Sequence, residues 1–133
     1  MEEKEKRKKV LEYQILQSRL NTLAKEREEI AQRIVEISQT MSSLDGLKKD
    51  DEIILSIGSG VFIKSKPVDD KFLVEIGSSM LLEKNKEEAK KILEKRKDDL
   101  EKALEQVENE IRKIGKEIEL IAMEVSGQNV QSS

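Results

Sequence analysis

The chain has 133 residues, a length that suits one domain, but 40% of them are charged and only 2% are aromatic. This composition excludes a thick globular core and, with 36% hydrophobic residues, indicates long helices in a coiled coil. The formal charge of −3 gives no strong attraction to nucleic acid or to an anionic membrane. Histidine and cysteine are absent, which removes the commonest general base, thiol nucleophiles and ordinary zinc sites. We therefore expect no enzyme activity, no metal site and no cofactor.

Targeting segments are not evident either. The N-terminal residues are charged and lack the apolar region of a signal peptide. No stretch approaches the roughly 20 apolar residues that cross a membrane. The sequence therefore predicts a soluble, cytoplasmic protein.

The first predicted element is a helix over residues 1–45. From Tyr13 to Leu44 the apolar residues alternate at spacings of three and four, and only Arg27 interrupts them. This heptad spacing, with Tyr13 at position a, predicts a narrow seam facing a second helix. The main seam residues are Leu20, Leu23, Ile30 and Ile34.

Two β-hairpins are predicted over residues 52–84, where the apolar period changes from 3.5 to 2. Gly-Ser turns separate short runs of β-branched and aromatic residues in both halves of this segment. Two isolated hairpins cannot cover their own apolar faces and leave strand edges unpaired. We therefore expect them to join an intersubunit β-barrel through six residues: Ile57, Val61, Ile63, Phe72, Val74 and Ile76.

The second helix is predicted over residues 85–125. Asn85 is a plausible N-cap with Glu88 three residues later. The seam of this helix is interrupted only at Lys97, and its main residues are Leu104, Val107, Ile111 and Ile118. Two helices of equal length joined by a compact insert predict an antiparallel two-helix coiled coil. The polar residues 126–133 are expected to form a disordered tail.

Four large apolar residues lie off the two seams near the ends of the chain. Leu11 and Ile15 fall at positions f and c of the first helix, and Leu120 and Met123 fall at c and f of the second. In an antiparallel pair all four come together at the open end. Grouped, exposed apolar side chains mark an interaction surface, so we predict that these residues bind another protein.

The order helix, two hairpins, helix resembles the α class of prefoldin subunits, and local sequence agrees with this resemblance. The matching segments are residues 12–17 (EYQILQ), 57–64 (IGSGVFIK) and 74–78 (VEIGS). The resemblance implies a mostly α fold with a small β element, assembled as a hexamer with β-type subunits in the ratio two α to four β. It also implies capture of unfolded client proteins without nucleotide and their delivery to a group II chaperonin, and together with the exposed patch it predicts that Leu11, Ile15, Leu120 and Met123 bind these clients.

Alternative interpretations remain open at this level. Some prefoldin-like proteins self-assemble into filaments through their β elements, and a coiled-coil adaptor for one specific partner has the same helical pattern. The Gly58-Ser59-Gly60 segment lacks the Gly-Lys-Ser/Thr of a phosphate-binding loop and precedes a strand. The basic residues between Lys4 and Lys9 are interleaved with glutamates and lack stacking aromatics, which favours a solvated helix start over nucleic-acid binding.

Overall fold

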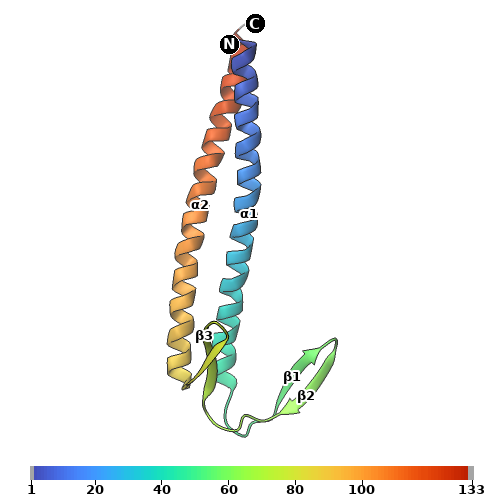
Figure 1. The fold of residues 1–133 in the computed structure, drawn as a ribbon, viewed down its shortest axis with the longest axis vertical. Helices are drawn as coiled ribbons and strands as arrows, with labels where there is room; N and C mark the ends of the chain where they lie inside the picture. The colour runs from blue at the N-terminus through green and yellow to red at the C-terminus, as the bar shows by residue number, and fades with distance from the viewer. Residues whose placement is uncertain (1, 132–133) are drawn as a thin grey trace. The chain divides into compact units, whose positions relative to one another are not determined.

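The chain forms two long helices that flank two β-hairpins. The computed structural model describes the backbone of residues 2–131 and the side chains of residues 2–126. The elements follow in chain order: α1 (Glu3–Gly46), β1 (Ile53–Gly58), β2 (Val61–Ser65), β3 (Phe72–Gly77), β4 (Met80–Lys84) and α2 (Lys86–Gln131), shown in Figure 1. This order confirms the predicted fold class.

Two compact units divide the chain, and each is described by itself. The helical unit comprises residues 1–33 and 100–133, and the hairpin unit comprises residues 34–99. α1 and α2 each contribute one part to each unit, and both hairpins belong to the hairpin unit.

In the helical unit, α1 and α2 lie side by side and antiparallel (Figure 1). The core consists of Leu23, Val107 and Ile114, which are less than 9% exposed. Leu16, Leu20, Ile30, Ile111 and Ile118 pack against this core and are partly buried. These residues recur every three or four positions, because a 3.5-residue repeat keeps one face of each helix toward the other.

The helix ends follow local capping chemistry. The amide of Glu88 donates to the Asn85 side-chain oxygen at 2.8 Å, which satisfies a donor that the first turn of α2 cannot pair internally. α1 ends at Gly46. α2 differs from the prediction, because its backbone stays helical to Gln131 instead of ending at residue 125. Residues 126–131 include no proline, and a single glycine weakens a helix without ending it; residues 132–133 of the expected tail lie outside the described residues.

Each hairpin closes through a two-residue turn with positive φ at both central positions. These φ angles are 51° and 79° at Ser59 and Gly60, and 49° and 60° at Ser78 and Ser79. Positive φ at both positions is the requirement of a type I′ turn, whose twist matches that of antiparallel strands.

Both hairpins also contain an irregularity that strict alternation did not predict. The strand register shifts between Ser56 and Gly58 in β1 and between Glu75 and Gly77 in β3. Ile57 and Ile76 therefore lie at bulges and have no directly opposed partner, because a bulge adds one residue to one strand of the pair.

Candidate protein-binding surfaces

The tip patch consists of Leu11 and Ile15 on α1 and Leu120 and Met123 on α2. All four side chains belong to the helical unit and are between 57% and 61% exposed. The core residues of the same unit have similar chemistry but are less than 9% exposed. Position in the heptad separates the two groups, since c and f residues point away from the seam.

Two ion pairs define how α1 and α2 are aligned at this patch. Lys9 Nζ lies 3.2 Å from a carboxylate oxygen of Glu124, and the Arg19 guanidinium donates to Glu110 at 2.5 Å. Both pairs link an early residue of α1 to a late residue of α2, and they bracket the patch along the helix axis. Leu11 and Ile15 are therefore level with the turns of α2 that carry the other two patch residues.

The same ion pairs show which patch residues share one side of the helix pair. Arg19 and Glu110 both occupy g positions in the predicted register. In an antiparallel pair the g positions of the two helices meet on one side and the e positions on the other. On each helix the c positions border the g positions, whereas the f positions lie directly opposite the seam. Ile15 and Leu120, at c positions, therefore lie on the same side of the pair, whereas Leu11 and Met123, at f positions, face outward from their own helices.

The charges beside the patch are stabilised by their partners. A hydrogen bond and the negative charge of Glu124 raise the pKa of the Lys9 ammonium above its usual value, with a further contribution from Glu12. A hydrogen bond to Glu110 likewise raises the pKa of the Arg19 guanidinium. Both cations stay charged at any physiological pH. These pairs were not identified from the sequence, although their g and d positions in the heptad are the signal that could have found them.

The hairpin of β1 and β2 presents apolar side chains on both of its faces. The register pairs Leu55 with Ile63 on one face and Ser56 with Phe62 on the other. Phe62 is 62% exposed and Ile63 is 50% exposed. Val61 and Ile57 are exposed as well. A two-stranded sheet that is apolar on both faces is not stable as an isolated element in water, so this hairpin requires a cover.

The hairpin of β3 and β4 is better covered within its own unit. Phe72 and Val74 are half-buried, whereas Ile76 is exposed. The Arg96 guanidinium on α2 donates a hydrogen bond to the backbone oxygen of Glu75. The six residues predicted for assembly thus divide into two half-buried members on β3 and four exposed members.

Two further seam residues and one further ion pair lie outside the tip patch. Ile34 and Leu104 are half-buried on their helices. Lys90 forms an ion pair with Asp45, and the hydrogen bond within this pair lowers the pKa of the Asp45 carboxyl group. Within residues 2–131 no group of three or more acidic side chains is arranged to hold a metal ion. No helix in that range has the length and apolar character needed to cross a membrane.

Comparison with known proteins agrees with the resemblance found in the sequence. Residues 16–131 match the family described as prefoldin subunit. Prefoldin subunit alpha 1 of Methanocaldococcus jannaschii is 32% identical over 82 residues, which cover 62% of this chain and 58% of the relative. Prefoldin subunit alpha of Pyrococcus horikoshii is 34% identical over 95 residues, covering 68% of this chain and 64% of the relative. The matched part thus spans a little over half of each relative.

The fold also resembles a solved structure. The cryo-EM structure of filamentous PFD from Methanocaldococcus jannaschii superposes with a TM-score of 0.71 and covers 82% of this chain and 94% of that chain. Sequence identity in this comparison is 24%, so the likeness is one of fold.

Proposed function

The chain belongs to the prefoldin family, and we propose on that premise that it is a non-enzymatic chaperone subunit that holds unfolded proteins at the tip patch. The observation that carries this proposal is the grouping of four large apolar side chains, each more than half exposed, between the Lys9–Glu124 and Arg19–Glu110 ion pairs of the helical unit. Unfolded proteins expose apolar side chains that need such a surface, whereas folded ones do not.

Binding at a single tip patch is weak because the patch is small. Covering a few side chains removes on the order of 100–200 Å² of apolar surface, which at about 25 cal/mol per Å² gives only a few kcal/mol before the entropy of association is subtracted. Several patches acting on one client raise the apparent affinity through effective concentration. The function therefore requires an assembly of several subunits.

The hairpins supply the surface for that assembly. The exposed apolar faces of β1 and β2 fit a sheet completed by other subunits. We expect β-type subunits as the partners, in a hexamer of two α-type and four β-type chains. The cellular setting of this proposal is the cytoplasm, with a group II chaperonin receiving the bound client.

The decisive experiment replaces Leu11, Ile15, Leu120 and Met123 together by Ser. The seam is untouched, so helicity and oligomer size should stay as in the parent. Suppression of aggregation of a chemically denatured client should fall at least tenfold, because each patch loses on the order of 1 kcal/mol per side chain and several patches act together.

A matched control carries Ser at four exposed polar positions: Gln14, Gln32, Gln39 and Gln106. This variant should protect the client as well as the parent does. Full protection by the tip variant at normal oligomer size would show that clients are held elsewhere.

A self-assembling filament is the second candidate. Two observations favour it: the structural neighbour is named as filamentous, and β1 and β2 expose apolar residues on both faces. Size measurement and electron microscopy of the purified chain, alone and mixed with a β-type subunit, separate the candidates. A hexamer formed only on mixing supports the chaperone, and a ladder of large species formed alone supports the filament. A small, defined dimer would support a coiled-coil adaptor.

A further inference from the structure

The outward surface of α1 carries no charged residue over residues 10–24. Of the 15 residues in this segment only Glu12 and Arg19 are charged, whereas 40% of the whole chain is charged. The outward heptad positions b, c, e and f hold nine uncharged residues, which we call the uncharged face of α1: Val10, Leu11, Gln14, Ile15, Gln17, Ser18, Asn21, Thr22 and Ala24.

The residues of the uncharged face are contiguous around the helix. Around an α-helix the heptad positions follow in the order a, e, b, f, c, g and d, so e, b, f and c form the half that faces away from the seam. Seven of the nine residues are exposed, and Gln17 and Ala24 are half-buried. The face extends over about 21 Å of α1 at 1.5 Å per residue.

The two charged residues of the segment lie at its edge and have partners. Glu12 and Arg19 occupy g positions, which border the seam. Lys9 Nζ lies 3.7 Å from a carboxylate oxygen of Glu12, and the Arg19 guanidinium pairs with Glu110 of α2. Neither charge therefore belongs to the uncharged face.

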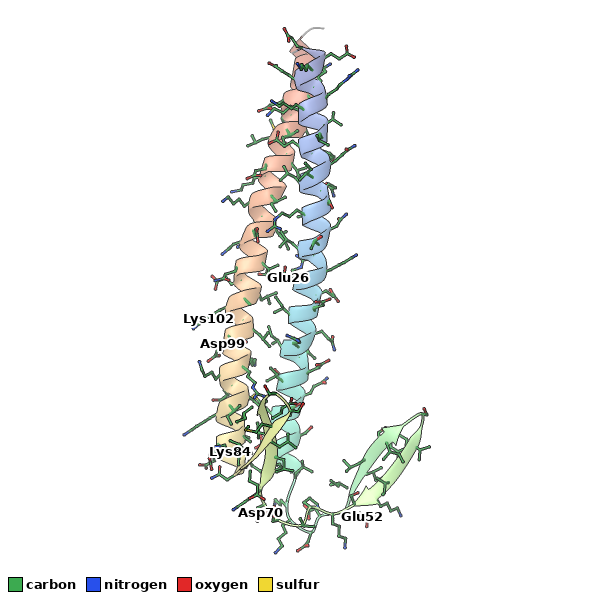
Figure 2. All side chains as sticks on the ribbon, in the orientation of Figure 1. Glu26, Glu52, Asp70, Lys84, Asp99 and Lys102 are labelled. Atoms are coloured by element: carbon green, nitrogen blue, oxygen red, sulfur yellow. The ribbon has the colours of Figure 1, made fainter. Side chains whose placement is uncertain are left out.

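Charged residues return on both sides of this segment and on the neighbouring helix. Residues 2–9 and residues 25–29 are all charged, and Figure 2 labels Glu26, which lies below the uncharged segment of α1 in that view. The Lys9–Glu124 and Arg19–Glu110 pairs place residues 106–123 of α2 at the level of the segment. Outward positions of that part of α2 include five charged residues: Glu108, Arg112, Lys113, Lys116 and Glu119. The absence of charge is thus specific to one segment of one helix.

The absence of charge is favourable for a surface that another chain covers. Covering a charged group without providing a partner is strongly unfavourable, whereas amide and hydroxyl groups hydrogen-bond readily to a polypeptide backbone. The Thr22 hydroxyl already donates to the backbone oxygen of Ser18 at 3.2 Å, so it stays satisfied when covered. The central parts of protein interfaces are depleted in charged residues, and the uncharged face shares this composition.

The size and polarity of the face limit the kind of partner that fits. A strip about 21 Å long and about 10 Å wide presents roughly 200 Å², well below the roughly 800 Å² that each partner of a stable interface buries. After Ile15 the face holds only polar residues and alanine, so it offers no apolar seam to a permanent third helix. An extended chain spans the same length with about six residues, at roughly 3.3 Å per residue. A short segment of an unfolded client meets these limits.

We propose that a bound client runs along α1, from Leu11 and Ile15 of the tip patch toward Ala24, and not along α2. Leu11 and Ile15 bind apolar side chains of the client, and the polar remainder of the face accepts the residues that follow. Because the face carries no charge, it accepts acidic and basic client segments alike. This inference rests on the proposed function and adds the path of the client beyond the tip.

The test places charges of either sign on the face in the assembled protein. Ser18 and Asn21 are exposed, and both become Glu in one variant, Lys in a second and Gln in a third. Suppression of aggregation of a chemically denatured client should fall about tenfold in both charged variants and stay at the parent level in the Gln variant, which matches Glu in shape. Glu, Lys and Gln all favour a helix more than Ser and Asn do, so unfolding of α1 does not explain a loss.

Gln106 and Asn109 on α2 provide the matched control. Both are exposed and lie three residues apart, as Ser18 and Asn21 do. Asn109 and Ser18 each precede a member of the same interhelical ion pair by one residue, so the two sites lie at the same level. Glu or Lys at both α2 positions should leave protection unchanged. Equal losses on α1 and α2, a loss with one sign of charge only, or a changed oligomer size of the α1 variants would overturn the inference.

A second measurement locates the client directly. The chain contains no cysteine, so Ser18→Cys and Asn109→Cys each provide a single site for a photoreactive label before assembly. The label at position 18 should cross-link a denatured client at least fivefold more than the label at position 109, and equal yields would also overturn the inference. The Ser variant of the tip patch separates the two proposals: if it loses protection while the charged α1 variants retain it, the proposed function stands and only the path along α1 fails.

Discussion

Leu23 and Leu11 are chemically identical, yet one is 3% exposed and the other 57%. The difference comes from heptad position: Leu23 faces the second helix, and Leu11 at position f does not. Single-residue changes in the helical unit therefore have effects that depend on the face of the helix that they occupy. We expect substitutions in the seam to alter stability, and substitutions at the exposed c and f positions to leave it nearly unchanged.

The destabilising effect of Gly115 on α2 is local and can be measured. The glycine lies within α2, and a Cβ placed there would meet no atom within 4 Å. Gly115→Ala should therefore raise the free energy of unfolding by about 1 kcal/mol per subunit, since alanine restricts the unfolded chain more than glycine does. Thermal unfolding followed by the helical circular dichroism signal measures the change.

Ala122→Gly provides the reverse substitution on the same exposed side of α2 and should lower the unfolding midpoint. No gain in Gly115→Ala would mean that the helix is held in shape by the assembly. Any accompanying loss of client protection would assign glycine a role in bending the helix near the patch.

At the scale of the element, the two hairpins share a plan but differ in turn chemistry. Gly60 occupies the second central position of the first turn, whereas Ser79 occupies that position in the second. A non-glycine residue in the left-handed region costs roughly 1–2 kcal/mol. The second hairpin therefore carries strain that the first avoids, and packing of Phe72 and Val74 in its unit offsets this strain.

Exchanging these turn residues tests that account. Replacing Ser78 and Ser79 by Asn and Gly should stabilise the β3–β4 hairpin by about 1 kcal/mol. Gly60→Ser should destabilise the β1–β2 hairpin by a similar amount, through backbone strain alone because no atom lies within 4 Å of the added Cβ. Hydrogen exchange of the strand amides reports on each hairpin separately. Unchanged protection in both variants would show that assembly, and not the turn, limits opening of the strands.

At the scale of the whole molecule, stability and assembly are linked. Each unit buries only a small group of residues, which includes Ala89 and Leu44 in the hairpin unit and Leu23 in the helical unit. No described side chain is less than 2% exposed. We expect a chain with such a thin core to gain much of its stability from association, because an isolated hairpin cannot bury its faces.

Ile63→Asp is expected to break the assembly. Ile63 is 50% exposed in the single chain, so a charge there costs little until another subunit covers it. Covering an unpaired carboxylate costs several kcal/mol, and the complex should dissociate into smaller species with most of its helical signal retained. Val68→Asp, at a position 85% exposed in the linker between the hairpins, provides the matched control. A complex of normal size in light scattering for Ile63→Asp would argue against an intersubunit barrel that includes β2.

The sequence by itself determined the number, type and order of the elements. Heptad spacing, the Asn85 cap and the Gly-Ser turns act over three to seven residues, so they are legible without long-range contacts. The off-seam placement of Leu11 and Met123 follows from the same spacing. The family resemblance rested on these local features as well, and it was confirmed by the match over residues 16–131.

The tertiary structure decided features that depend on residues far apart in the chain. The pairing of Lys9 with Glu124 and of Arg19 with Glu110 sets the axial alignment of the helices, and a heptad repeat alone permits several alignments. The bulges at Ile57 and Ile76 and the unequal cover of the two hairpins arise from strand pairing and packing. Such contacts join segments whose sequences do not encode each other's position, which is why only the folded chain shows how the patch residues of the two helices are aligned along the axis.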